Sequence, residues 1–314
     1  MKFNSTLIMD FLNNRYAYKC RKASLTKYMR LTMKELHSLE KGFAMSSPKP
    51  GFGKAHIEKI TTYVNETKKI GKLDEEVFMM VHSIFSQYVE LQKSLNYSGD
   101  VLTAVENFLK GFENVIPDRT YGGAQKLTRV KTALDMPFNE CVLSRHSTRN
   151  YSDEPIDKDK LKEAISLAAH CPSACNRQAF HAYILDSTQF DKLGPYKSGG
   201  IGGFIDKVKA IIVITGIVSA YEENESYQYI VSPSIFAGYL TLSLHAYGFG
   251  SCVVQRPVQH TRTWKNIARS IGAEEDEQIV CMITVGMPAE EDIYPQSHRL
   301  NIEKIMKEVS ANNE

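Results

Sequence analysis

Two arginines and two hydroxyl side chains lie within the five residues Arg145-His146-Ser147-Thr148-Arg149. A guanidinium presents a planar set of donors that fits phosphate oxygens, and serine or threonine adds a short hydroxyl donor. Such a cluster predicts a site for a phosphate monoester. A solvated basic turn before the next helix is the alternative interpretation of the same residues.

Three other segments carry polar or glycine residues where predicted elements meet. The segment 172–178 follows a predicted helix and precedes a predicted strand, a place where loops hold polar side chains and amides against ligands. Gly248 and Gly250 lie where an apolar helical run ends, which by itself indicates a helix cap. Arg299 precedes the last predicted helix, and taken alone it would be a surface arginine.

Two further pairs of residues are candidates for a metal ion. Cys171 and Cys175 are separated by one residue more than in the common CxxC pair, and the six scattered cysteines favour reduced thiols over a disulfide framework. His37 and Glu40 are one helical turn apart and could share a ligand or a metal. A helix that ends with Gly42 as its C-terminal cap explains this pair better. We therefore predict no metal site.

The elements that must position these residues fall into two regions. Apolar residues from 77 to 91 recur at helical spacing after the acidic start 74–76. Similar runs on either side predict an α-helical region over residues 1–136, followed by a second domain over residues 137–314. The predicted helices of the first region are 24–41, 54–70, 77–91 and a run that begins at Val101.

Beyond residue 137, short β-rich runs alternate with helical runs, which is the pattern of a mixed α/β or α+β domain. The predicted strands are 181–186, 210–216, 250–255 and 278–286. The predicted helices are 158–170, 187–193, 228–247, 261–271 and 301–309.

The composition of the 314-residue chain excludes several classes of protein. It is 43% hydrophobic and 24% charged, with a formal net charge of +2, the profile of a globular protein without a nucleic-acid or membrane-surface footprint. Asp10 interrupts the first apolar stretch and no small-residue cleavage site follows. No apolar run approaches the roughly 20 residues of a membrane span. We therefore expect a soluble, cytoplasmic protein.

Taken together, four segments resemble the FMN-dependent nitroreductase family over roughly residues 137–309, in their order and in the elements between them. The first resembles the family's R-x-S-x-R/K signature, and the second resembles its P-S-x-x-N-x-Q-P loop, with Ala179 in place of the last proline. The third resembles the helix–G-x-G–strand junction, and the fourth resembles the closing G-x-P followed by a basic residue. The matching residues are Arg145, Ser147, Arg149, Pro172, Ser173, Asn176, Gln178, Gly248, Gly250 and Arg299.

The resemblance implies how the first and last of these segments meet FMN. Arg145 and Ser147 would bind the phosphate and ribityl end, and Arg299 would return to the phosphate. Arg149 would lie closer to the flavin ring, where it is a candidate for charge compensation. His146 also fits the pattern, although a turn histidine explains it equally well.

The resemblance also implies an α+β fold with a mixed, mainly antiparallel sheet flanked by helices, preceded here by the helical region. In the family, the loop that matches residues 172–178 meets FMN across a subunit interface, which implies a homodimer with shared sites. Gly248 and Gly250 would offer backbone contacts to the flavin.

The implied activity is that of an FMN-dependent oxidoreductase. NADH or NADPH delivers a hydride to flavin N5 and leaves, and a nitroaromatic, a quinone or another small oxidised substrate takes its place, in ping-pong kinetics. No protein nucleophile is needed, so we predict no catalytic side chain. Many family members carry Asn and Lys or Arg where this chain has the stretch 199–203, rich in glycine. A flavin-dependent dehydrogenase of a biosynthetic pathway and a non-enzymatic flavin-binding module therefore remain alternatives.

Overall fold

A computed structural model describes residues 25–112, 115–128, 134–194, 201–221, 225, 227–255 and 261–309. The chain divides into two compact units. The helical unit combines Lys22–Gln125 with Ile293–Glu314, and the α/β unit contains Lys126–Asp292. The sequence predicted one boundary at residue 136 and a second domain that runs to 314. The division differs because the last segment of the chain packs with the helices, as described below.

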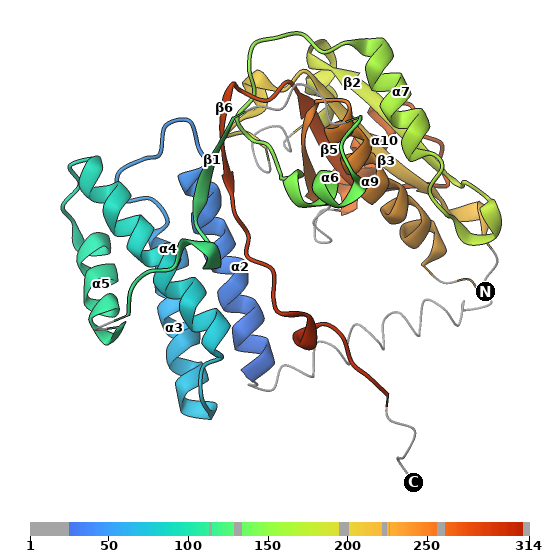
Figure 1. Ribbon diagram of the computed structural model, residues 1–314. Helices are drawn as coiled ribbons and strands as arrows, with labels where there is room; N and C mark the ends of the chain where they lie inside the picture. Colours follow the sequence, from blue (N-terminus) through green and yellow to red (C-terminus); the bar gives the residue numbers. More distant parts are fainter. Residues whose placement is uncertain are drawn as a thin grey trace. The chain divides into compact units, whose positions relative to one another are not determined.

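Helix α4 lies at the centre of the helical unit. Val77, Ile84, Phe85 and Tyr88 on this helix are fully buried, and residues of its neighbours complete one apolar core. The Asp74 carboxylate accepts hydrogen bonds from the first backbone amides of α4, which confirms the predicted acidic helix start. The helices of this unit, which Figure 1 labels, are α2 (Leu25–Phe43), α3 (Lys54–Ile70), α4 (Glu75–Ser94) and α5 (Asp100–Leu109).

The loop between α2 and α3 is tightly packed, and its glycines follow from that packing. A Cβ atom on Gly42 would lie 2.1 Å from the ring of Phe52, and one on Gly53 would lie 2.4 Å from Leu39. Gly53 also has a φ of +80°, a conformation that glycine adopts without strain. Because α2 continues to Phe43, Gly42 lies inside the helix, and the sequence-based prediction of a helix end at Gly42 was wrong.

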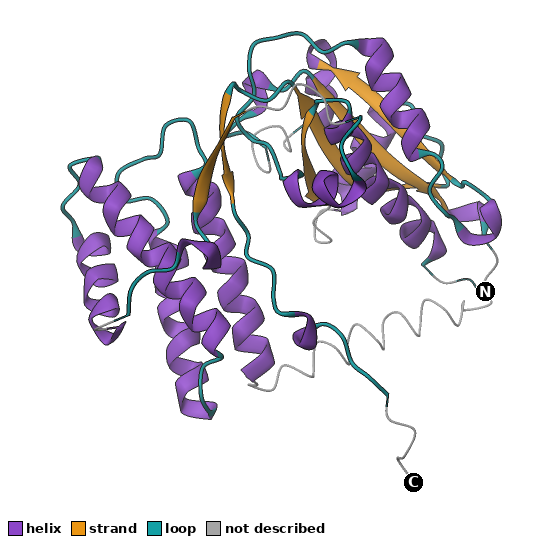
Figure 2. Ribbon diagram, in the orientation of Figure 1, coloured by secondary structure: helices purple, strands orange, loops and turns teal. Residues whose placement is uncertain are grey.

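The α/β unit is built on a four-stranded sheet with the strand order β2-β3-β5-β4, shown as orange arrows in Figure 2. Every adjacent pair of strands in this sheet is antiparallel. All four strands were predicted from the sequence, because their alternating or continuous apolar runs fit half-buried and buried strands. Their bounds are β2 (Phe180–Asp186), β3 (Ala210–Ile217), β4 (Gly250–Gln255) and β5 (Glu277–Gly286).

Helices cover both faces of the sheet. On one face, α7 (Lys158–Ala168) and α9 (Gln228–Ala246) bury Leu161, Phe236 and Leu240 against the strands. On the other face, Ile267 of α10 (Thr261–Ser270) packs with Ile211 and Val213 of β3. This α+β arrangement matches the fold expected from the sequence. In the described part of the chain, no helix is long and apolar enough to span a bilayer.

Shorter elements depart from the sequence-based prediction. Helix α6 (Phe138–Ser144) and the two-stranded sheet of β1 (Ala124–Thr128) and β6 (Glu291–Pro295) were not predicted. The predicted helix 187–193 is a 3₁₀ helix. The predicted helix 301–309 is reduced to one 3₁₀ turn at Ile302–Lys304, and its apolar side chains remain exposed instead of covering a core.

Candidate functional site

The segment that carries the predicted phosphate ligands is held against the edge of the sheet by its backbone. Ser147 forms a parallel bridge with Ser251 at the start of β4, and the Thr148 amide donates to the Ser251 carbonyl at 2.9 Å. Gly250 permits this approach, because a Cβ atom there would lie 2.8 Å from the Thr148 side chain. Gly248 has a φ of +82° and ends α9. Both glycines therefore have a structural role in placing this segment.

The next residues continue along the same end of the sheet. Tyr151 is buried, forms an antiparallel bridge with Pro288, and its hydroxyl lies 2.8 Å from Thr284 Oγ1. A Cβ atom on Gly286 would lie 2.7 Å from the Tyr151 ring. Gly286 and Pro288 of the G-x-P sequence therefore pack closely against Tyr151, which follows residues 145–149, called the arginine segment below.

The side chains of this segment form a half-buried cationic group. Arg145, Ser147 and Arg149 are each partly exposed. The Arg149 guanidinium donates to the Ser147 carbonyl at 3.2 Å, and His146 Nδ1 lies 3.0 Å from the Ser144 carbonyl. The structure therefore carries two guanidinium groups, an imidazole and a hydroxyl on one short segment whose backbone is anchored to β4 and to the chain after β5. Such a donor set suits a doubly charged phosphate.

His245 is a member of this group that the sequence analysis missed. Its Nε2 atom lies 2.8 Å from Ser144 Oγ, and its ring centroid lies 6.4 Å from that of His146. Burial, together with the nearby His146 and Arg145, lowers the pKa of His245 to about 4. The imidazole is therefore neutral at physiological pH. A single histidine at the end of an apolar helix gives no motif by which it could have been recognised.

The predicted partner loop is exposed and has an unusual backbone. Cys175, Asn176 and Gln178 have φ angles of +51°, +53° and +50°, a region that L-residues rarely occupy. The Ser173 hydroxyl accepts a hydrogen bond from the Gln178 amide at 3.1 Å. Pro172, Asn176 and Gln178 are exposed. The loop thus presents an amide-rich surface in a defined shape.

Contacts with helix α9 show how far residues 145–149 lie from the loop 172–178 within the α/β unit. The Ala174 amide donates to Ser232 Oγ in the first turns of α9, whereas Ser144 contacts His245 in the last turn. With a rise of about 1.5 Å per residue, Ser232 and His245 are roughly 20 Å apart along the helix axis. One chain therefore keeps its arginine segment and its loop 172–178 at opposite ends of α9.

The chemistry of the cysteines does not suggest a nucleophile. Cys171 and Cys252 are buried, and burial raises the pKa of the Cys171 thiol, which disfavours the reactive thiolate. Cys175 is exposed in the loop described above. That no side chain is catalytic stays a prediction.

The stretch 199–203 is described in part, since Gly199 and Gly200 lie outside the described residues. Ile201 is buried, and Phe204 packs beside Tyr151 with ring centroids 6.3 Å apart. Gly202 and Gly203 between them are exposed. The described half of this stretch is therefore anchored at both ends by apolar side chains.

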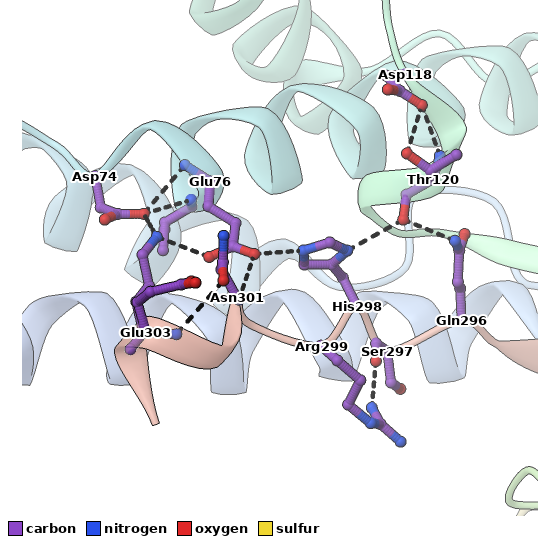
Figure 3. A network of polar contacts seen from close by, with 12 residues as sticks. Asp74, Glu76, Asp118, Thr120, Gln296, Ser297, His298, Arg299, Asn301 and Glu303 are labelled. Atoms are coloured by element: carbon purple, nitrogen blue, oxygen red, sulfur yellow. Dashed lines mark hydrogen bonds and ion pairs between the residues drawn. The ribbon is translucent and has the colours of Figure 1, made fainter. Parts of the chain in front are cut away.

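Arg299 belongs to the helical unit. Its neighbours are held there by polar contacts, which Figure 3 shows from close by. His298 bonds to Glu76 at 2.8 Å and to the Thr120 carbonyl at 3.1 Å, and Lys304 reaches Glu76 at 2.7 Å. Arg299 itself is exposed and donates to the Ser297 carbonyl.

Glu40 anchors the same C-terminal segment from α2. Its carboxylate is 2% exposed and accepts hydrogen bonds from the amides of Gly123 at 2.9 Å and Ser297 at 3.2 Å. His37 Nδ1 lies 3.1 Å from the second carboxylate oxygen. Donors of the chain itself therefore occupy the Glu40 carboxylate. The sequence suggested that His37 and Glu40 could share a ligand. In the structure both residues contact Ser297, whose hydroxyl lies 3.0 Å from His37 Nδ1.

Part of the chain is similar to known proteins. The model of the nitroreductase family matches residues 142–201. A putative NADH dehydrogenase/NAD(P)H nitroreductase of Archaeoglobus fulgidus is 25% identical over 179 residues, which are 54% of this chain and 99% of that protein. A CLA biosynthesis enone reductase of Lactiplantibacillus plantarum is 33% identical over 61 residues, 19% of this chain and 28% of that relative's length.

Solved structures with a similar chain path cover the same part. An FMN-dependent nitroreductase from Clostridium difficile is 24% identical, with a TM-score of 0.44 and coverage of 55% of this chain and 98% of that chain. A putative NADH dehydrogenase/NAD(P)H nitroreductase from Parabacteroides distasonis is 19% identical, with a TM-score of 0.47 and the same two coverages. The resemblance seen in the sequence is confirmed for residues 142–201, which match the nitroreductase family model, and the chain has an α+β region with a helical region before it.

Proposed function

We propose that this protein is an FMN-dependent oxidoreductase of the nitroreductase type, with NADH or NADPH as its reductant. The observation that carries the proposal is the fixed cationic segment 145–149, which coincides with the start of the family match. Its two guanidinium groups and hydroxyl suit the phosphate of FMN in number and type. A half-buried position also suits a cofactor that is bound firmly and kept partly from water.

When bound, FMN would accept a hydride from the nicotinamide and pass it to an oxidised substrate that enters after the nicotinamide has left. In this proposal, Arg145 and Ser147 bind the phosphate end. Arg149, four residues further along the same fixed segment, offsets negative charge near the flavin ring. The protein contributes orientation and charge compensation, and no side chain forms a covalent bond to substrate.

The proposed active form is a homodimer in which loop 172–178 serves the flavin of the partner subunit. Support comes from the separation along α9, because the loop and the arginine segment of one chain contact opposite ends of that helix. A flavin seated at the arginine segment would therefore need such a loop from a second copy. The exposed position of Asn176 and Gln178 suits this role.

The outer side of α9 supports the same proposal. Phe236 and Leu240 are buried on the sheet side, whereas Val231, Ile235 and Tyr239 are 44%, 36% and 45% exposed. These three residues follow one another at four-residue spacing, so they form one apolar stripe along the helix. Apolar stripes of this kind mark protein interfaces more often than free surface. A second copy of the chain is the partner we propose for it.

The spectrum of the purified protein tests the proposed function. We expect a flavin absorbance that extracts as FMN and that bleaches anaerobically on addition of NADH or NADPH. The reduced protein should then be reoxidised by a nitroaromatic or a quinone; an enone belongs in the same panel because one relative is named as an enone reductase. A protein that stays colourless after incubation with FMN would overturn the proposal. A bound flavin that neither nicotinamide reduces would favour the binding-module alternative.

The dimer has its own test in Ile235→Glu, which introduces a charge into the apolar stripe of α9. We expect the variant to be monomeric by sedimentation and to have lost FMN. Asn266→Glu on α10, on the opposite face of the sheet, adds the same charge to an exposed position and should remain dimeric. A wild-type monomer that binds FMN fully would contradict the shared site.

The family resemblance also assigns Arg299 to the phosphate, and we retain this role as a separate proposal. Arg299→Ala should weaken the binding of FMN and leave that of riboflavin, which lacks the phosphate, unchanged. Equal effects on the two flavins would exclude the assignment.

A further inference from the structure

The last residue of α6 is joined to the last turn of α9 by one side-chain contact. Ser144 Oγ lies 2.8 Å from His245 Nε2. The same hydroxyl lies 3.4 Å from the Cys141 carbonyl and 3.6 Å from Met136 Sδ, and His245 Nε2 is the nearest of these three groups. Ser144 directly precedes Arg145, whose amide closes the final turn of α6. The contact with His245 therefore lies at the point where the chain leaves α6, beside the backbone bond from Arg145 to Cys141.

The other end of the arginine segment is fixed close by. Thr148 is bonded to the Ser251 carbonyl, and Ser251 lies six residues after His245 in the sequence. The corner between α9 and β4, which turns at Gly248, thus supplies both anchors. Removal of the His245 anchor would take away the side-chain contact that ties the start of the segment to α9 and would leave the backbone bond of Arg145 to Cys141 in place.

We propose that His245 is a positioning residue that accepts a hydrogen bond from Ser144 and thereby fixes Arg145 and His146 for the phosphate of the flavin. This inference rests on the proposed function, because it concerns the same site. His245 need not touch the flavin for this role. His245 acts through Ser144, which directly precedes Arg145.

The surroundings of His245 are consistent with an acceptor. Arg145 and His146 are the charged or titratable groups that act on its pKa, and both, together with burial, favour the neutral imidazole. A neutral ring has one nitrogen without a proton, and in the tautomer protonated at Nδ1 this nitrogen is Nε2, which then accepts from the Ser144 hydroxyl. Since the pKa is about 4, the imidazole stays neutral and this contact persists across pH 6 to 8.

The test compares FMN with riboflavin, which lacks the phosphate. His245→Met removes the acceptor and keeps an apolar side chain of similar length, and Ser144→Ala removes the donor. Each should weaken FMN binding about 3- to 10-fold, the effect of one lost buried hydrogen bond, and leave riboflavin binding unchanged. Because both remove the same contact, the double variant should be no worse than either single variant. His245→Gln, whose amide can reach the Nε2 position, should restore most of the FMN affinity.

Ser243→Ala is the matched control on the same helix. Ser243 is buried and donates to the Ala164 carbonyl of α7 at 2.6 Å, away from the arginine segment. Its loss should leave the ratio of FMN to riboflavin affinity unchanged. If His245→Met does not fold, Ser144→Ala carries the test, with its thermal transition recorded beside that of the wild type.

The outcomes separate the two proposals. Wild-type protein that binds neither flavin would overturn the proposed function. Wild-type protein that prefers FMN, combined with an unchanged preference in Ser144→Ala and His245→Met, would overturn the positioning role alone. Equal loss of both flavins in these variants would also overturn it, because a general packing defect does not select for the phosphate.

Discussion

The helical unit and the α/β unit each contain a short polar segment that stands out in the sequence, and the two segments are used differently. In the helical unit, the carboxylate of Glu40 is buried and occupied by donors from Gly123, Ser297 and His37. In the α/β unit, the segment 145–149 is anchored mainly by its backbone, and its arginine side chains are half-buried. The first segment holds the chain together, and the second is the one for which we propose a ligand.

The difference shows what separates a structural motif from a binding motif when both contain charged residues. A buried carboxylate that has several donors of its own chain is already satisfied, and a ligand would have to displace them. Two half-buried guanidinium groups on an anchored backbone carry about ten N–H donors between them, more than the hydrogen bond from Arg149 to the Ser147 carbonyl uses. Substitutions in the two segments should therefore divide between stability and ligand affinity.

The largest expected effect is on the stability of the helical unit. Glu40→Ala leaves the buried amides of Gly123 and Ser297 without their acceptor, and we expect a loss of about 3–5 kcal/mol in the free energy of unfolding. Urea denaturation followed by helical circular dichroism measures it. Glu58→Ala, at an exposed position on α3, should change stability by less than about 0.5 kcal/mol. A Glu40→Ala protein as stable as the wild type would contradict the structural role that we assign to Glu40.

The next effect is on affinity in the α/β unit. Arg145→Ala should weaken FMN binding about 10- to 100-fold, the cost of a charge-assisted hydrogen bond, with a stability change below about 0.5 kcal/mol. Flavin fluorescence titration gives the affinity, with riboflavin as the reference ligand. Lys162→Ala on α7, which removes an exposed cation, should leave both flavins unaffected. A large loss of stability in Arg145→Ala would show that residues 145–149 mainly stabilise the fold, as Glu40 does.

A third variant tests whether a substitution in the α/β unit can also affect stability when the residue is a buried carboxylate with several hydrogen-bond donors. Glu277 of β5 is 7% exposed and accepts from Tyr183 at 2.9 Å, from Thr215 and from His181 at 3.0 Å. Burial alone would raise the pKa of Glu277, but the hydrogen bonds from Thr215, Tyr183 and His181 outweigh it and lower the pKa below its ordinary value of 4.5. Glu277→Gln should cost about 1–3 kcal/mol at pH 7, because the amide NH₂ faces other donors.

The pH dependence of the Glu277 contribution has a definite sign. A carboxyl whose pKa is lower in the folded than in the unfolded protein stabilises the fold above the unfolded value of about 4.5, and this stabilisation is lost as the pH falls through the folded value. The free energy of unfolding of the wild type should therefore decrease below pH 4.5, and Glu277→Gln should reduce that decrease. The same slope in both proteins would contradict this assignment.

The smallest effect belongs to the ion pairs of the C-terminal segment. Lys304 lies 2.6 Å from Asp74 and 2.7 Å from Glu76, and all three side chains are less than one third exposed. Lys304→Met should destabilise the helical unit by about 1 kcal/mol, and less in high salt. Lys93→Met removes a more exposed pair with Glu106 and should have no measurable effect. Equal effects of the two substitutions would show that partial burial does not matter here.

Elements with a strong period were predictable from the sequence. Helix α3 and strand β4 have the bounds that the sequence predicted, 54–70 and 250–255, because apolar spacing and local punctuation agree there. Strands β1 and β6 were missed because each is short and is stabilised by a partner far away in the chain. In 301–309 the apolar residues recur at helical spacing, but this segment is held by polar contacts of Asn301 and Lys304 instead.

The candidate site was predictable to the extent that its residues are neighbours in the sequence. Arg145, Ser147 and Arg149 form a local pattern, and the structure shows them on one anchored segment. The contact of Ser144 with His245 joins residues 101 positions apart, and no local pattern contains it. The binding roles of these residues, and those of Gly248, Gly250 and the loop 172–178, stay predictions.

The helical unit is made of two pieces of sequence, and this affects the order in which the protein can fold during synthesis. Ser297 is 257 residues beyond Glu40. At roughly 5–20 residues per second, a ribosome needs on the order of 10–50 s to cover that distance. Throughout that interval the buried carboxylate of the nascent helical unit lacks one of its donors, whereas all of Lys126–Asp292 is made without interruption. We expect pulse proteolysis of stalled nascent chains to find the helices less protected in chains that end before Ser297 than in chains that include it.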